Sequence, residues 1–201
     1  MLGDVERARQ FSSEALRVAE RFGADHSIVY ALAACGVASC LALRWEEADG
    51  FFERARQRIA TTGAGGEWGS VIDGHWAVAR AGMGDRERSL ALARSAVEHA
   101  RANGVPLVTA IDGIHRARVL RVIGGPQYQH ELEAQVAEAF ELFLRADMKS
   151  WIPLILLERA GLARLRGDAD GMARDLAEAR RLFAEMGVTG WDAYARSIEA
   201  S

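Results

Sequence analysis

The side chains best suited to chemistry in this sequence are arginines, histidines and a tryptophan that recur at intervals of about 40 residues. They form two adjacent columns, the first being Trp76, Arg116 and Arg159 and the second His75, His115 and Glu158. A row of cations and aromatic rings on one surface would bind acidic or aromatic groups of a partner, because arginine and tryptophan are enriched at binding hot spots. The alternative is an exposed helix face whose charges are paired locally.

These residue types do not combine into a catalytic or metal-binding pattern. Asp73 and His75 are two positions apart, which places them on different sides of a helix, and no third soft ligand is near them. Ser70 lies on the same expected helix, which cannot align a nucleophile, a base and an acid. The glycine-rich segment 63–66 lacks the lysine that a phosphate-binding loop requires. We therefore expect no enzyme activity, no metal and no cofactor.

Charge and composition exclude further classes of protein. The 25 basic residues are balanced by 28 acidic ones, so the net charge of −3 argues against a nucleic-acid binder. Cys35 and Cys40 are five apart, which on a helix disfavours a disulfide and indicates reduced thiols. The N-terminus shows no signal-peptide pattern, and the uncharged run 27–43 is rich in small residues, as a buried helix would be. We expect a cytoplasmic protein without membrane or direct nucleic-acid contacts.

The elements that would position the two columns are repeats. Small residues and a closing glycine recur with a period of about 40 residues. The five copies consist of Gly3, Ala8, Ala15 and Gly23; Leu43, Ala48, Ala55 and Gly63; Gly84, Ser89, Ala96 and Gly104; Gln127, Leu132, Ala139 and Asp147; and Gly167, Met172, Ala179 and Gly187. Small residues seven apart lie on one helix face, and a glycine that follows ends the helix.

The segments between these copies also read as helices, each with one small residue in its second half. These residues are Gly36, Ala77, Ala117 and Ala160. No alternation of period two persists, so the sequence predicts an all-α fold. The expected helices are 4–22, 25–43, 45–62, 67–83, 85–103, 106–123, 127–146, 149–166, 168–186 and 190–200, with a short insertion around Gly125.

A helix pair cannot bury its apolar stripe alone, so we expect the pairs to stack into a right-handed superhelical solenoid. The single domain 1–201 divides into units at about 1–23, 24–63, 64–104, 105–147 and 148–187, followed by a capping helix within 188–201. The first helix lacks the partner that the other units have. We therefore expect a fragment of a longer protein, or a second molecule that covers this open face by self-association.

The repeat pattern resembles tetratricopeptide repeats, with small residues at fixed positions and a Gly-Asp pair at 84–85 and 167–168. The long period is similar to that of repeats at the C-terminus of bacterial LuxR-type ATPase regulators and cyclase–ATPase fusions, and the stretch 177–191 is similar to the way many of these proteins end. The family's aromatic residue in the first helix of each pair is replaced by Ser39, Arg80, Leu120 and Ala163.

This resemblance implies a non-enzymatic module for protein–protein interaction or regulation within a bacterial signalling or transcription protein. The partner would be a protein or peptide. The alternative is a sensor that binds a small ligand or peptide in a concave groove lined by the first column, Trp76, Arg116 and Arg159. A sensor would show a concave pocket with convergent polar groups, whereas a scaffold would show a broad exposed patch.

Overall fold

The computed structural model describes residues 4–123, 126–188 and 190–200, and this part of the chain is all-α, without a strand. Its helices are α1 (Val5–Phe22), α2 (Asp25–Leu41), α3 (Trp45–Thr62), α4 (Gly69–Gly82), α5 (Arg86–Ala102), α6 (Pro106–Ile123), α7 (Gln129–Arg145), α8 (Ile152–Leu165), α9 (Ala169–Glu185) and α10 (Asp192–Ala200). Short 3₁₀ turns precede α4, α7 and α8. The expected helices agree with these to within three residues at each end; Gly3, Gly124 and Gly125 lie outside the described residues.

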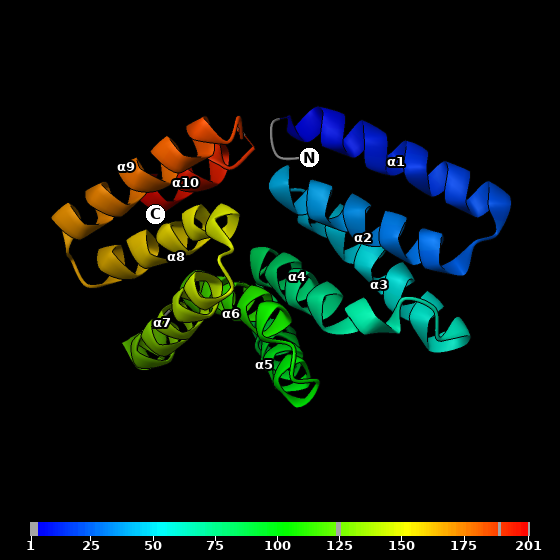
Figure 1. Cartoon of the computed structure of the whole chain (residues 1–201), viewed down its shortest axis with the longest axis horizontal. Coiled ribbons are helices and arrows are strands. Elements are labelled where there is room, and N and C mark those ends of the chain that lie inside the picture. The colour runs from blue at the N-terminus through cyan, green and yellow to red at the C-terminus, as the bar shows by residue number, and fades with distance from the viewer. Residues whose placement is uncertain (1–3, 124–125, 189, 201) are drawn as a thin grey trace.

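The helices pack in neighbouring pairs that follow one another around an arc (Figure 1). Helices α1 to α3 form one arm, α8 to α10 form the other, and α4 to α7 lie between them. The even-numbered helices α2, α4, α6 and α8 also contact one another in sequence, and α10 contacts α8. We call these five helices the inner row, and the odd-numbered helices the outer row.

Local residues determine where the helices begin and end. The carboxylates of Asp4, Asp85 and Asp168 accept hydrogen bonds from backbone amides three residues later, at the start of α1, α5 and α9. Six glycines follow helices in the left-handed conformation, namely Gly23, Gly63, Gly84, Gly104, Gly167 and Gly187. These are the glycines that the repeat pattern marks as helix ends, because glycine adopts positive φ without steric cost.

Leu43 and Asp147 have positive φ at two of the other turn positions, where a side chain makes that conformation unfavourable. Leu43 occupies the position that Gly84 and Gly167 hold in other repeats. Leu43 therefore carries a conformational cost that the glycines at the equivalent turns avoid.

The small residues of the repeat lie where helices approach most closely. Ala48, Ala55, Ala96, Ala139 and Ala179 are all buried, and so are the small residues of the inner row, Gly36, Ala77, Ala117 and Ala160. A Cβ atom on Gly36 would lie 2.6 Å from the ring of the buried Phe52. The pairing of helices therefore depends on small side chains at these positions, as the sequence predicts. Ala15, the corresponding residue of α1, is the exception, because it is exposed.

We expect the substitution Ala179→Leu to lower the free energy of unfolding by about 1–3 kcal/mol, because added volume in a packed core forces side chains and backbone apart. Ala179 is fully buried against α8 and α10, among Leu157, Ala160 and Ile198. Urea denaturation measures the effect. Ala184→Leu is the control, since Ala184 is exposed on the same helix; equal stabilities for the two variants would contradict the repeat register.

Cys35 and Cys40 are not disulfide-bonded. Burial raises the pKa of the Cys40 thiol to about 12.

None of the described helices combines the length and the apolar character that a membrane crossing requires.

Candidate functional site

The first predicted column does not line a groove on the inner row. Trp76 donates a hydrogen bond to Asp49 on α3, Arg116 pairs with Glu131 on α7, and Arg159 pairs with Asp175 on α9. All three partners belong to the outer row, so the column lies between the two rows of helices. The predicted binding column is therefore not confirmed, since Arg116 and Arg159 are paired with carboxylates of the outer row.

The Arg159 contact is strong enough to predict a cost for its loss. Nε and Nη2 of Arg159 donate to the two carboxylate oxygens of Asp175, each over 2.7 Å, and the Asp175 side chain is buried. Arg159→Ala leaves that carboxylate without its main partner and is expected to lower the free energy of unfolding by about 1–3 kcal/mol. The control is Arg174→Ala, because Arg174 approaches Asp175 only to 3.6 Å. Urea denaturation showing no difference between them would contradict this assignment.

The second predicted column lies between the helices of the inner row. The rings of His75 on α4 and His115 on α6 are 4.0 Å apart between centroids. Glu158 on α8 is fully buried and faces α6. The structure therefore places the predicted histidines and the glutamate inside the contacts that join one repeat to the next.

Glu158 is the centre of a buried polar network. Its Oε1 accepts hydrogen bonds from Arg118 Nε and from the Tyr194 hydroxyl, each over 2.8 Å, and its Oε2 accepts one from Arg121 Nε over 3.1 Å. Arg121 also donates to the Tyr194 hydroxyl. The network joins α6, α8 and α10, which are far apart in the sequence.

The electrostatics of the network favour an ionised Glu158 carboxylate beside the two charged arginines. Burial acts to raise the pKa of Glu158, but the guanidiniums of Arg118 and Arg121 and the Tyr194 hydroxyl lower it below its ordinary value. Burial raises the pKa of Tyr194 to about 12, so this hydroxyl is neutral. Two cations therefore share one carboxylate in an environment that is almost free of solvent.

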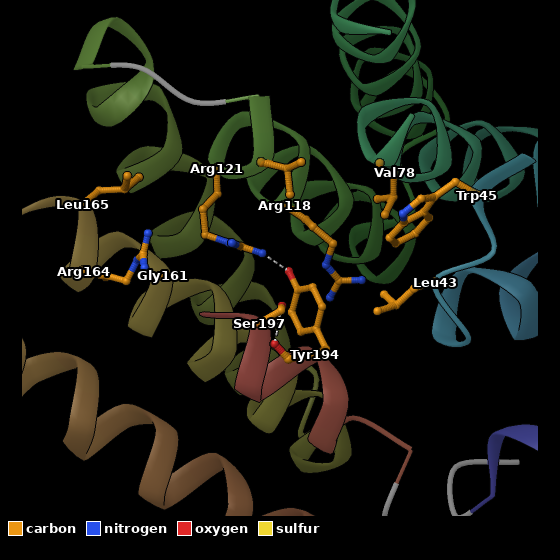
Figure 2. Close-up of a pocket in the computed structure, with 12 residues that line it drawn as sticks. Leu43, Trp45, Val78, Arg118, Arg121, Gly161, Arg164, Leu165, Tyr194 and Ser197 are labelled. Atoms are coloured by element: carbon orange, nitrogen blue, oxygen red, sulfur yellow. Dashed lines mark hydrogen bonds between the residues drawn. The ribbon is translucent and has the colours of Figure 1, made fainter. Parts of the chain in front are cut away.

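Beside this network lies a pocket of about 390 Å³ (Figure 2). Its lining residues are Leu43, Trp45, Val78, Gly82, Arg118, Arg121, Val122, Gly161, Arg164, Leu165, Tyr194 and Ser197. Helices α6 and α8 each contribute residues at i, i+3 and i+4, and α4 contributes the equivalent i and i+4 residues, so one face of each helix lines the pocket. Helix α10 and the turn before α3 complete the wall. Pockets for small ligands in proteins have volumes of about 300–1,000 Å³.

The charged residues of this lining are all arginines, namely Arg118, Arg121 and Arg164. Figure 2 shows the Arg118 guanidinium between the ring of Tyr194 and Leu43. Within the described part of the chain, Arg118 Nη2 is buried and has no hydrogen-bond partner. No described carboxylate lies within 4.0 Å of Arg164. The pocket therefore has more positive charge than the single carboxylate of Glu158 neutralises.

A smaller cavity of about 50 Å³ adjoins the pocket and shares five lining residues with it, Leu43, Trp45, Val78, Arg118 and Tyr194. Trp191, the residue immediately before α10, also lines the smaller cavity. Its Nε1 atom is buried and, among the described residues, has no hydrogen-bond partner. The smaller cavity thus has two side chains in its wall with an unsatisfied N–H donor.

Apolar side chains are unusually exposed around the larger pocket. Leu43 and Val122 are each 46% exposed, and Leu165 is 44% exposed. All three line the pocket. Their exposure in one place gives the pocket an apolar rim, which would be covered by a bound apolar group.

Two glycines permit this shape. A Cβ atom on Gly82 would lie 2.4 Å from the Trp45 indole, and one on Gly161 would lie 2.1 Å from Cδ of Arg121. Both glycines line the pocket. Any larger residue would force Trp45 or Arg121 out of its position in the wall.

The sequence analysis missed Arg118, Arg121 and Tyr194. The sequence did contain a signal for Arg118. It stands three positions after His115, and the residues three positions after His75 and Glu158 are Val78 and Gly161. Residues three apart share a helix face, so an arginine in an otherwise apolar or glycine column marks that face as unusual. Tyr194 carried no comparable signal, because its partner Arg121 is 73 positions away.

A second buried cluster lies between α4 and α6. The Asp112 carboxylate and the His115 ring are both buried, and His115 Nδ1 lies 3.6 Å from Asp112 Oδ1. Neither Asp112 oxygen has a geometrically satisfactory hydrogen bond to a described residue. Burial raises the pKa of Asp112 to about 7, and burial together with the nearby Arg118 cation lowers that of His115 to about 3. Both groups are therefore mainly neutral in the native protein near pH 6.

No group of three metal-ligating side chains with suitable geometry occurs among the residues described above. No family model matches the chain, and neither the curated proteins nor the solved structures give a match.

Proposed function

We propose that the chain is a non-enzymatic helical-repeat binding module and that the pocket on its inner row is the recognition site. The fold would be a right-handed superhelical solenoid of tetratricopeptide-like pairs, ending in α10 as a cap. The period of about 40 residues and the contacts along the inner row support this arrangement. The observation that carries the function is the pocket, whose wall repeats over three successive inner helices.

The pocket favours a ligand sensor over a scaffold alone, although its lining contains none of Trp76, Arg116 and Arg159, the residues predicted from the sequence to line such a groove. It combines convergent arginines with an exposed apolar rim, the combination by which ligand sites orient and bury a small molecule. The proposed context, regulation within a bacterial signalling or transcription protein, rests on the resemblance of the repeats and of the stretch 177–191.

A blocking substitution tests the proposal. Val122→Trp would fill part of the pocket from its exposed rim without entering the core, because Val122 is 46% exposed. Thermal melts of the wild-type protein and of this variant would be recorded against a library of metabolites and short peptides. We expect at least one compound to raise the melting temperature of the wild type and to have a much smaller effect on Val122→Trp.

Val105→Trp is the matched control, since Val105 is 44% exposed and does not line the pocket. A stabilising compound should act on this control as it acts on the wild type. Stabilisers that act equally on all three proteins would place their site elsewhere and contradict the proposal.

Self-association through α1 is a second candidate, favoured by its exposed phenylalanines. Phe11 is 66% exposed and Phe22 is 77% exposed on the helix that ends one arm. A large apolar surface of this kind commonly marks a contact with another protein. We expect sedimentation velocity to show concentration-dependent association that is lost when both residues are replaced by serine; a monomer at all concentrations would exclude it.

A further inference from the structure

We infer that the pocket binds an amphipathic organic anion, with a single carboxylate or phosphate head in the smaller cavity and an apolar chain in the larger pocket. This inference rests on the proposed function and specifies the class of its ligand. The two adjoining cavities differ in chemistry, and each matches one half of such a molecule.

The smaller cavity is suited to a ligand atom that accepts hydrogen bonds. Its wall includes Arg118 and Trp191, whose Nη2 and Nε1 atoms are buried N–H donors without a hydrogen-bond partner among the described residues. The Arg118 guanidinium also packs over the rings of Trp191 and Tyr194. A buried donor left without an acceptor is unfavourable, so a ligand oxygen that accepts from it is favoured. None of the described residues that form this wall carries a carboxylate.

Charge selects an anionic acceptor over a neutral one. Among the described residues, Glu158 is the only carboxylate bonded to Arg118 or Arg121, and Arg164 adds a third cation at the larger pocket. The other titratable side chains of the smaller cavity add no negative charge: burial keeps Cys40 protonated and His75 uncharged, and Tyr194 is neutral. Arginine forms its strongest hydrogen bonds with carboxylate and phosphate oxygens.

The larger pocket supplies the surface for an apolar chain. Leu43, Val122 and Leu165 are exposed around it, and Trp45 and Val78 lie in its wall. Leu43 lies at the junction of the two cavities and keeps a positive φ that glycine would adopt without strain. The strained leucine is explained if its side chain contacts the ligand.

Calorimetric titration with decanoate tests the inference, with decyl phosphate, decanol and acetate as comparison ligands. We expect decanoate or decyl phosphate to bind, and the comparison of the two identifies the head group. Decanol, which has the chain without the charge, should bind at least about tenfold more weakly, since a hydrogen bond to a charged group contributes about 1.5–3 kcal/mol. Acetate, which has the charge without the chain, should also bind at least about tenfold more weakly.

Trp191→Phe removes the indole donor and keeps an aromatic ring. It should weaken decanoate binding by about tenfold, the loss expected for one charge-assisted hydrogen bond. The matched control is Trp151→Phe. Trp151 stacks on Phe143 as Trp191 stacks on Phe183, with interplanar angles of 5° in both pairs, and it lines neither cavity. Equal binding by the two variants would overturn the placement of the head group.

Leu43→Gly tests the chain. The variant should unfold at no lower a temperature than the wild type, because glycine relieves the left-handed turn, and should bind decanoate more weakly. Unchanged affinity would overturn the placement of the chain. The inference as a whole is overturned if decanol binds as tightly as decanoate. It is also overturned if the library compounds whose binding is blocked by Val122→Trp are all cationic, neutral or peptide ligands. In that last case the proposed function would stand without this ligand class.

Discussion

Glu158→Gln is expected to lower the free energy of unfolding by about 3–5 kcal/mol, the cost of breaking a buried ion pair by removing one partner. The substitution conserves shape but leaves the guanidiniums of Arg118 and Arg121 buried without a countercharge. Because Tyr194 donates to the same carboxylate, the docking of α10 onto α6 and α8 should loosen as well. Urea denaturation gives the energy, and hydrogen exchange in α10 reports the loosening.

Glu178→Gln is the control for this prediction. Glu178 pairs with Arg181 over 2.7 Å, but both side chains are exposed, and exposed ion pairs contribute about 0–1 kcal/mol. The network described around Glu158 would be refuted if both glutamine variants unfolded at the same urea concentration with equal slopes.

Asp112→Asn is expected to stabilise the protein at pH 8 by about 1–3 kcal/mol. Burial raises the pKa of Asp112 from its ordinary value of 3.8 to about 7, so at pH 8 the native state must hold a buried carboxylate without adequate hydrogen bonds. A shift of this size corresponds to at most about 4 kcal/mol, and the amide of asparagine recovers only part of it, since it too requires partners.

The sign of the pH dependence follows from which state holds the proton. Between about pH 4 and pH 7 native Asp112 keeps its proton while the unfolded chain has lost it, so rising pH removes stability through this interval. His115 acts in the opposite direction: its pKa falls from 6.5 to about 3, so falling pH protonates the unfolded chain first and removes stability. In the wild type these two contributions oppose each other between about pH 4 and pH 6.5.

Asp112→Asn removes the contribution of Asp112 to the pH dependence and keeps that of His115. Its advantage over the wild type should be largest at pH 8 and should shrink as the pH falls towards 4. Its own stability should fall below about pH 6.5 because of His115 and of the adjacent His75, whose pKa burial also lowers. Urea denaturation across this range measures both effects. Asp147→Asn is the control, since Asp147 is exposed and asparagine tolerates its positive φ. An advantage that does not vary with pH would contradict the assignment.

The candidate site was predictable only in part. His75, His115 and Glu158, predicted as one column of binding residues, lie instead in the contacts between helices of the inner row, where Glu158 and His115 are buried. The column at Arg116 and Arg159 was interpreted as a groove, but its carboxylate partners Glu131 and Asp175 lie 15 and 16 positions further along, on the next outer helix. Spacing identifies the face of a helix that a residue occupies, but not which neighbour that face meets.

The sequence by itself determined the helices, their ends and their pairing. Glycine is required at positive φ, and only small residues such as Gly36 and Ala179 fit where helices approach closely, so these features are encoded within a few residues of the chain. The tertiary structure alone decided which face of each inner helix lines the pocket and that Tyr194 meets Arg121. The physical reason is that contacts between distant helices depend on how all the helix pairs between them pack, which no short stretch of sequence specifies.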